Sequence, residues 1–149
     1  MIITSKGGTR MALIIDTKEY LNTVCMLLAE GKTDVPVPVT GNSMCPFLHP
    51  GDIVYLNLPG TPKRGDIVLF TRPDGSFVLH RIYRVCRDGS FLLLGDNQLI
   101  PEPVPAAQIQ AKVTGARRKD KPLKVTSFRW WCYTHLWTRP VRRIAGKLR

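Results

Sequence analysis

A serine and a histidine are the side chains of this chain that could carry chemistry together. Ser43 lies in the segment VTGNSMCPFLHPGD, where an extended run meets a turn, between Gly41 and Pro46. A serine hydroxyl is a poor nucleophile until a base removes its proton. From the local sequence alone, the commoner role of such a serine is a hydrogen bond to the backbone of its own turn.

Among the three histidines of the chain, His80 best fits the position of a base. It lies within the β-like run VLHRIYRV, where strict alternation places Ile82 and Arg84 on its face. A histidine there is either a buried structural residue or a base, and its ordinary pKa of about 6.5 allows proton transfer at neutral pH. His49 fits a loop residue, and His135 lies in a basic C-terminal segment.

A carboxylate that orients the imidazole would complete such a group. Asp96, in LLLGDNQ, follows a β-like run directly, and Glu102 comes six residues later. The alternative for Asp96 is ordinary turn chemistry, because Gly-Asp-Asn is a favourable turn sequence.

The elements that must position these residues are mainly short strands. Asp16 and Glu19 form a capping-box pattern that begins an amphipathic helix over 16–30, and Gly31 ends it. Seven β-like runs follow, bounded by Gly, Pro and Asp turns: 35–39, 53–58, 66–70, 77–85, 90–94, 110–116 and 123–126. The first holds two prolines and is expected at a sheet edge. The sequence therefore predicts an N-terminal arm and helix (1–34), a β-rich domain (35–126) and a C-terminal helix (127–149).

Composition and charge narrow the classes further. The chain has 149 residues, 44% of them apolar, and it has no apolar run long enough to cross a membrane. Its N-terminus lacks the apolar stretch of a secretory signal. We expect a location in the cytoplasm or at the inner face of the membrane.

The net charge of +11 is concentrated near the C-terminus, where residues 117–149 hold 11 of the 22 basic side chains and one of the 11 acidic ones. Within them, residues 128–148 show an apolar stripe at helical spacing, and three tryptophans fall within eight residues of this segment. This pattern is typical of a helix on an anionic membrane surface. The alternatives are packing on the β domain, with a merely solvated basic face, and, less favoured, nucleic acid binding.

No cofactor or metal is expected. The four cysteines, Cys25, Cys45, Cys86 and Cys132, are far apart, and no Cys/His pair has zinc-ligand spacing. Free thiols are the simplest interpretation.

Four ordered motifs between about Val39 and Gly115 carry a resemblance to a known family. The strings GNSM-x-P-x-L-x-x-GD-I-V, KRGDIVLF, VLHRI and GDN resemble the signal peptidase I family of serine endopeptidases and its relatives, the self-cleaving repressor peptidases. The resemblance implies a body of antiparallel sheets, in agreement with the β pattern above. It also implies that Ser43 is the nucleophile and that His80 is the general base, as in the Ser-His branch of the family.

The same resemblance leaves two carboxylates as the orienting group. Asp96 matches the Gly-Asp-Asn motif, and Glu102 stands where the Ser-His branch carries a second aspartate; we favour Asp96 slightly. Members of the family usually have a transmembrane helix before the serine motif, whereas helix 16–30 is amphipathic.

The sequence thus predicts a serine endopeptidase that cleaves precursor or leader peptides after small residues through a Ser43–His80 dyad or a triad. The alternative is a catalytically idle β domain that binds nucleic acid or anionic surfaces through its basic tail.

Overall fold

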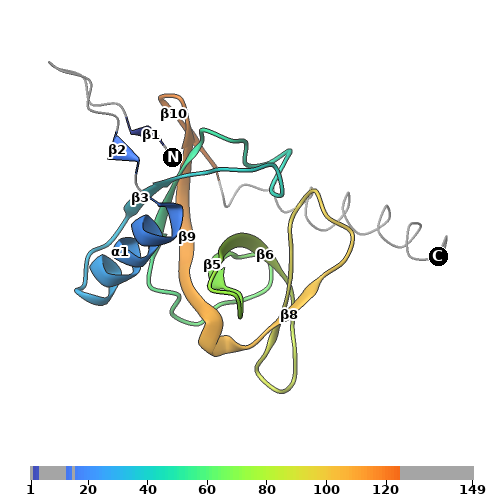
Figure 1. The fold of residues 1–149 in the computed structure, drawn as a ribbon. Helices are drawn as coiled ribbons and strands as arrows, with labels where there is room; N and C mark the ends of the chain where they lie inside the picture. The colour runs from blue at the N-terminus through green and yellow to red at the C-terminus, as the bar shows by residue number, and fades with distance from the viewer. Residues whose placement is uncertain (1, 4–12, 15, 125–149) are drawn as a thin grey trace, which may run out of the picture.

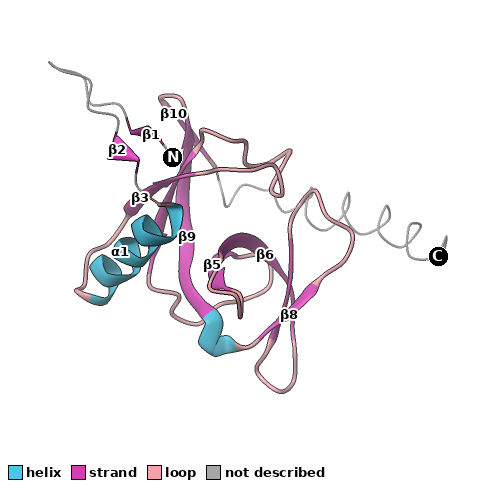
Figure 2. Cartoon of the chain, viewed as in Figure 1, coloured by secondary structure: helices cyan, strands magenta, loops and turns pink. Residues whose placement is uncertain are grey.

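The computed structural model describes residues 2–3, 13–14 and 16–124 of the chain (Figure 1). Within this part the fold is mainly β, with one α-helix, as the sequence predicts (Figure 2). None of the described helices is long and apolar enough to cross a membrane. The helix expected over 128–148, and the question of whether it lies on a membrane, fall outside the described residues.

Helix α1 spans Thr17–Ala29 and begins as the capping pattern predicts. The Asp16 side chain accepts a hydrogen bond from the Lys18 N–H at 3.2 Å. The buried face of the helix consists of Leu21, Val24 and Leu28, which join the core of the sheet. Helix α1 packs beside strand β3 (Val35–Pro38), and the Tyr20 hydroxyl donates a hydrogen bond to the Pro36 carbonyl at 3.2 Å.

The main sheet has eight strands, and all of its pairs are antiparallel. Their order is β3-β4-β9-β5-β6-β7-β8, and β10 pairs with β9. The remaining strands are β4 (Ile53–Asn57), β5 (Ile67–Thr71), β6 (Phe77–Val85), β7 (Phe91–Leu94), β8 (Glu102–Val104), β9 (Ile109–Arg118) and β10 (Lys121–Leu123). A short 3-10 helix, η1 (Ala106–Gln108), precedes β9. β3 lies at one edge of the order, as its prolines predict.

Two hairpins turn where Asp-Gly pairs predict them. The Asp74 carboxylate accepts hydrogen bonds from the Ser76 N–H and hydroxyl, at 2.8 and 2.6 Å. The turn before β7 repeats this arrangement with Asp88 and Ser90. The glycine in the middle of each turn has a positive φ, 81° and 84°, which glycine adopts at little cost.

Two hydrophobic clusters fill the space around the sheet. The larger joins α1 to the strands β3, β4, β5 and β9. The smaller lies around Val68, Phe70, Ile82 and Leu93, on strands β5 to β7. His80 belongs to the second region, because its ring centroid lies 5.8 Å from that of Phe70.

The sequence missed several details. Ile2–Ile3 (β1) and Leu13–Ile14 (β2) pair as a two-stranded antiparallel sheet, which the sequence did not predict. Strand β8 was not predicted. In β6 the register shifts between Ile82 and Arg84, so strict alternation fails there and Arg84 is exposed instead of sharing the buried face of His80.

Candidate active site

Ser43 lies in the long turn between β3 and β4, and its backbone is fixed by the Gly-Asp-Asn turn that follows β7. The Asn97 N–H donates a hydrogen bond to the Ser43 carbonyl at 2.9 Å, and the Asn97 side-chain amide donates one to the Asn42 carbonyl at 3.4 Å. Gly95 is buried against the same carbonyl, since a Cβ atom there would lie 2.6 Å from the Ser43 oxygen. The Gly-Asp-Asn motif therefore serves as a backbone support for the serine.

The far end of the serine loop is held by a buried carboxylate. The Asp52 side chain, 3% exposed, accepts two hydrogen bonds from the Arg118 guanidinium, at 2.9 and 2.8 Å, and one from the His49 N–H at 2.8 Å. Arg118 also donates to the Phe47 carbonyl at 2.9 Å. The Arg118 hydrogen bonds are the largest cause of a lowered pKa of Asp52. His49 is a loop residue, as expected, with Nε2 2.9 Å from the Pro46 carbonyl.

His80 lies on β6 with its side chain 1% exposed. Its backbone pairs with Val68 on β5, in the middle of the sheet. Burial is the largest cause of the lowered pKa of this imidazole, because a low-dielectric surrounding disfavours the charged ring. His80 is therefore neutral at pH 7 and able to accept a proton.

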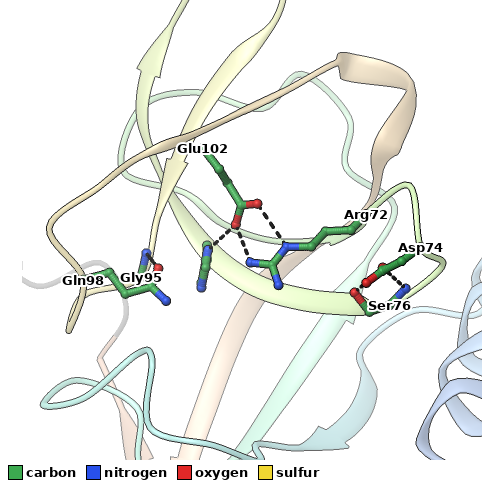
Figure 3. Close-up of polar contacts among 7 residues, drawn as sticks. Arg72, Asp74, Ser76, Gly95, Gln98 and Glu102 are labelled. Atoms are coloured by element: carbon green, nitrogen blue, oxygen red, sulfur yellow. Dashed lines mark hydrogen bonds and ion pairs between the residues drawn. The ribbon is translucent and has the colours of Figure 1, made fainter.

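The carboxylate beside His80 belongs to Glu102. Its Oε1 atom lies 3.2 Å from His80 Nδ1, at the distance of an ion pair. The two groups are not aligned as a hydrogen bond, and Nδ1 is buried without a hydrogen-bond partner in the described part of the chain. Arg72 holds the same carboxylate with two hydrogen bonds, from Nε to Oε2 at 3.0 Å and from Nη2 to Oε1 at 2.8 Å (Figure 3).

Asp96 pairs with a different residue. Its two carboxylate oxygens each accept a hydrogen bond of 2.9 Å from the Arg81 guanidinium, and the exposed fractions of the two side chains are 2% and 8%. Arg81 also donates to the Gly65 carbonyl at 2.8 Å, and its guanidinium carbon lies 5.5 Å from the centre of the Phe47 ring.

The carboxylate that lies 3.2 Å from His80 Nδ1 is that of Glu102, which favours Glu102 over Asp96 as the orienting group. Asp96 instead connects the strand of His80 to the turn that supports Ser43, because Arg81 follows His80 and Asn97 follows Asp96.

The structure thus forms two sets of contacts: His80 with Glu102, and the Ser43 backbone with the Gly-Asp-Asn turn. No hydrogen bond joins Ser43 Oγ to His80 among the described residues. Catalytic hydrogen bonds are often long or absent without substrate, so this geometry leaves the pairing of Ser43 with His80 as a hypothesis.

Sequence reasoning missed the arginines of the site. Arg72, Arg81 and Arg118 each hold one carboxylate with two hydrogen bonds. A buried arginine beside the histidine was a usable signal for Arg81, because guanidinium groups inside a strand need an acidic partner. Arg118 was counted in the basic tail, although it faces Asp52.

In the described ranges, no three His, Cys, Asp or Glu side chains lie together in a group that could hold a metal ion. Cys25, Cys45 and Cys86 are free thiols.

Comparison with known proteins gives one family. The model of the Peptidase S24-like family matches residues 3–115, a range that contains Ser43, His80, Asp96 and Glu102. No curated protein matches the chain. Because the matched range covers well over half of its length, the chain belongs to the Peptidase S24-like family.

Proposed function

We propose that this protein is a serine endopeptidase in which Ser43 is the nucleophile, His80 the general base and Glu102 the carboxylate that orients the imidazole. The observation that carries the proposal is the placement of a buried histidine against a carboxylate, with Nδ1 and Oε1 3.2 Å apart, in a chain of a peptidase-like family. A buried imidazole needs a polar partner, and a carboxylate on the Nδ1 side is the partner that orients a histidine base.

In the proposed reaction, Ser43 Oγ attacks the carbonyl carbon of the scissile peptide bond while its proton moves to His80 Nε2. Glu102 stabilises the imidazolium that forms, through the Nδ1 side of the ring. Collapse of the tetrahedral intermediate breaks the C–N bond, and the imidazolium gives its proton to the leaving amine. Water, deprotonated by the same histidine, then hydrolyses the acyl-enzyme.

The support of the Ser43 backbone fits the need for an oxyanion site. The donors in this proposal are the Ser43 N–H and a group near Gly41 and Asn42. A backbone donor acts only if it is held in place before the reaction. The hydrogen bond from Asn97 to the Ser43 carbonyl fixes the adjoining peptide units.

For the substrate we propose an extended precursor or leader peptide with a small residue before the cleaved bond, as the likeness to signal peptidases implies. Such a peptide would bind by adding to a sheet edge, where backbone groups await partners. Some Peptidase S24-like proteins use the same chemistry to cleave themselves. The mass of the intact chain distinguishes the two cases, because only self-cleavage shortens the chain.

Cleavage of a peptide library that carries small residues tests the proposal. The wild-type chain should cleave it, and Ser43→Ala and His80→Ala should each abolish cleavage. The double variant should be no slower than either single one, because the two groups act as a unit. Ser90→Ala is the matched control, since Ser90 lies in a hairpin turn. Unchanged cleavage by Ser43→Ala would refute the proposal. If the wild-type chain cleaves itself but none of the peptides, the substrate is the chain itself and not a separate peptide.

A further inference from the structure

Arg72 binds Glu102 with two hydrogen bonds, both shorter than the 3.2 Å contact between Glu102 and His80. Arg72 is not itself a member of the proposed Ser43–His80 dyad. It follows the last residue of β5, while Glu102 begins the edge strand β8. The Glu102 oxygen that receives Nη2 of Arg72 at 2.8 Å is also the oxygen that lies 3.2 Å from His80 Nδ1 (Figure 3). One carboxylate oxygen thus joins the guanidinium to the imidazole.

The backbone of Arg72 is itself fixed. Its N–H donates to the Ser76 carbonyl at 2.9 Å, and its carbonyl accepts from the Gly75 N–H at 2.8 Å. The Asp74–Ser76 hydrogen bonds lock the same turn (Figure 3). The arginine therefore projects from a rigid hairpin toward a carboxylate on a short strand at the edge of the sheet.

A two-pronged guanidinium contact sets both the position and the plane of a carboxylate. Glu102 needs such a constraint, because 30% of its side chain is exposed and its strand has three residues. With Arg72 in place, Oε1 is directed at the histidine and Oε2 is occupied by Nε.

The charge of Arg72 acts on the same groups. Two charged side chains face the imidazole: Glu102, from β8, raises the pKa of His80, and Arg72, from the end of β5, lowers it. Both act on a ring whose pKa is lowered most by burial. The Arg72 hydrogen bonds are also the largest cause of the lowered pKa of Glu102.

We infer that Arg72 is a positioning residue for catalysis: it holds Glu102 against His80 Nδ1 and opposes, with its own charge, protonation of the resting base. The inference rests on the proposed function, in which a neutral His80 accepts the proton of Ser43. The alternative is that the Arg72–Glu102 ion pair only stabilises the edge of the sheet, in which case its loss would change stability and not the rate.

Two substitutions separate the geometry of Arg72 from its charge. Arg72→Gln removes both, and Arg72→Lys keeps the charge but cannot form the two-pronged contact. Arg84→Gln, on the exposed end of β6, is the control that removes one positive charge from the strand of His80. Arg72 is itself 39% exposed, so we expect all three full-length variants to fold.

The measurements are the pKa of His80 by NMR titration and the rate of Ser43 acylation by an activated acyl probe across pH. The imidazole signal of His80 is identified by its absence in His80→Asn. In Arg72→Gln we expect the pKa of His80 to rise and the pH of half-maximal acylation to rise with it. The plateau rate should fall by up to about 100-fold, the effect of a catalytic group displaced by about 1 Å.

Arg72→Lys should keep the pKa of His80 close to that of the wild type while its plateau rate still falls. Arg84→Gln should match the wild type in both measurements. If wild-type Ser43 is acylated but Arg72→Gln leaves both the pKa and the rate unchanged, the role of Arg72 is refuted and the proposed function stands. If wild-type Ser43 is not acylated at any pH, the proposed function itself fails. Should Arg72→Gln not fold, the plateau rate of Arg72→Lys decides: a wild-type rate refutes the inference.

Discussion

Glu102 and Asp96 are both carboxylates near the site, and their partners give them different roles. Glu102 lies against the imidazole of His80, and Asp96 accepts two hydrogen bonds from the guanidinium of Arg81. We therefore expect Glu102→Gln to slow catalysis by a factor on the order of 10³–10⁴, because the amide neither stabilises the imidazolium nor fixes its tautomer. Steady-state kinetics at pH 7.5, with melting temperature as the control for folding, measure this.

Asp96→Asn should act mainly on stability. It leaves the guanidinium of Arg81, 8% exposed, without its charged partner, and breaking a buried pair on one side destabilises a protein by about 3–5 kcal/mol. Urea denaturation measures the change in the free energy of unfolding. If Asp96→Asn were fully stable and slow, and Glu102→Gln active, the orienting role would return to Asp96.

The sequence identified both carboxylates but could not choose between them, because the choice depends on a long-range contact. Gly-Asp-Asn is a recognisable motif, and this favoured Asp96. Glu102 faces His80 only because β8 pairs with β7, which places Glu102 opposite Leu93 and Leu93 opposite Ile82. The three-residue strand β8 gives almost no pattern of its own, and Pro103 at its centre argues against a strand unless it lies at an edge.

At the scale of elements, the contact between the Gly-Asp-Asn turn and the serine loop carries the site. Gly95→Ala would place a Cβ atom 2.6 Å from the Ser43 carbonyl oxygen, which is backbone and cannot swing away. We expect the Ser43 turn to shift and activity to fall by about 100-fold. Gly115→Ala is the control, because its Cβ would meet Tyr55 at 3.4 Å. Peptidase assays on both variants, with chemical shifts near Ser43, make the comparison.

Wild-type rates in Gly95→Ala would mean that the turn does not position the serine.

Some elements of the fold can be predicted from the sequence, and others cannot. Asp-Gly hairpins and a capped helix follow from local rules, and both occur where expected. The register shift in β6 does not, because a bulge depends on the twist of the neighbouring strands.

At the scale of the whole molecule, the lowered pKa values link stability to pH. The unfolded chain protonates His80 near pH 6.5, whereas the folded chain protonates it only at lower pH. Between these values the unfolded state binds more protons, so the free energy of unfolding falls as pH falls. Asp52 and Glu102, whose pKa values are lowered from 3.8 and 4.5, add a further loss at more acidic pH.

Urea denaturation between pH 7.5 and pH 5 measures the contribution of His80. We expect the wild type to lose stability over this range and His80→Gln, which has no titrating ring there, to lose less. Equal losses in the two proteins would show that His80 is not held neutral by the fold. The role of the basic C-terminal segment as a membrane anchor stays a prediction from the sequence.

Covalent labelling of Ser43 is the most direct test of the account. A fluorophosphonate probe, followed by peptide mass spectrometry, should label Ser43 in the wild type and leave Ser90 unlabelled. The rate should rise with pH through a single ionisation below about 6.5, because burial lowers the pKa of His80. His80→Ala should remove the labelling. A wild-type chain that is folded yet unlabelled at every pH, or that is labelled equally well without His80, would contradict the assignment of Ser43 and His80 as nucleophile and base.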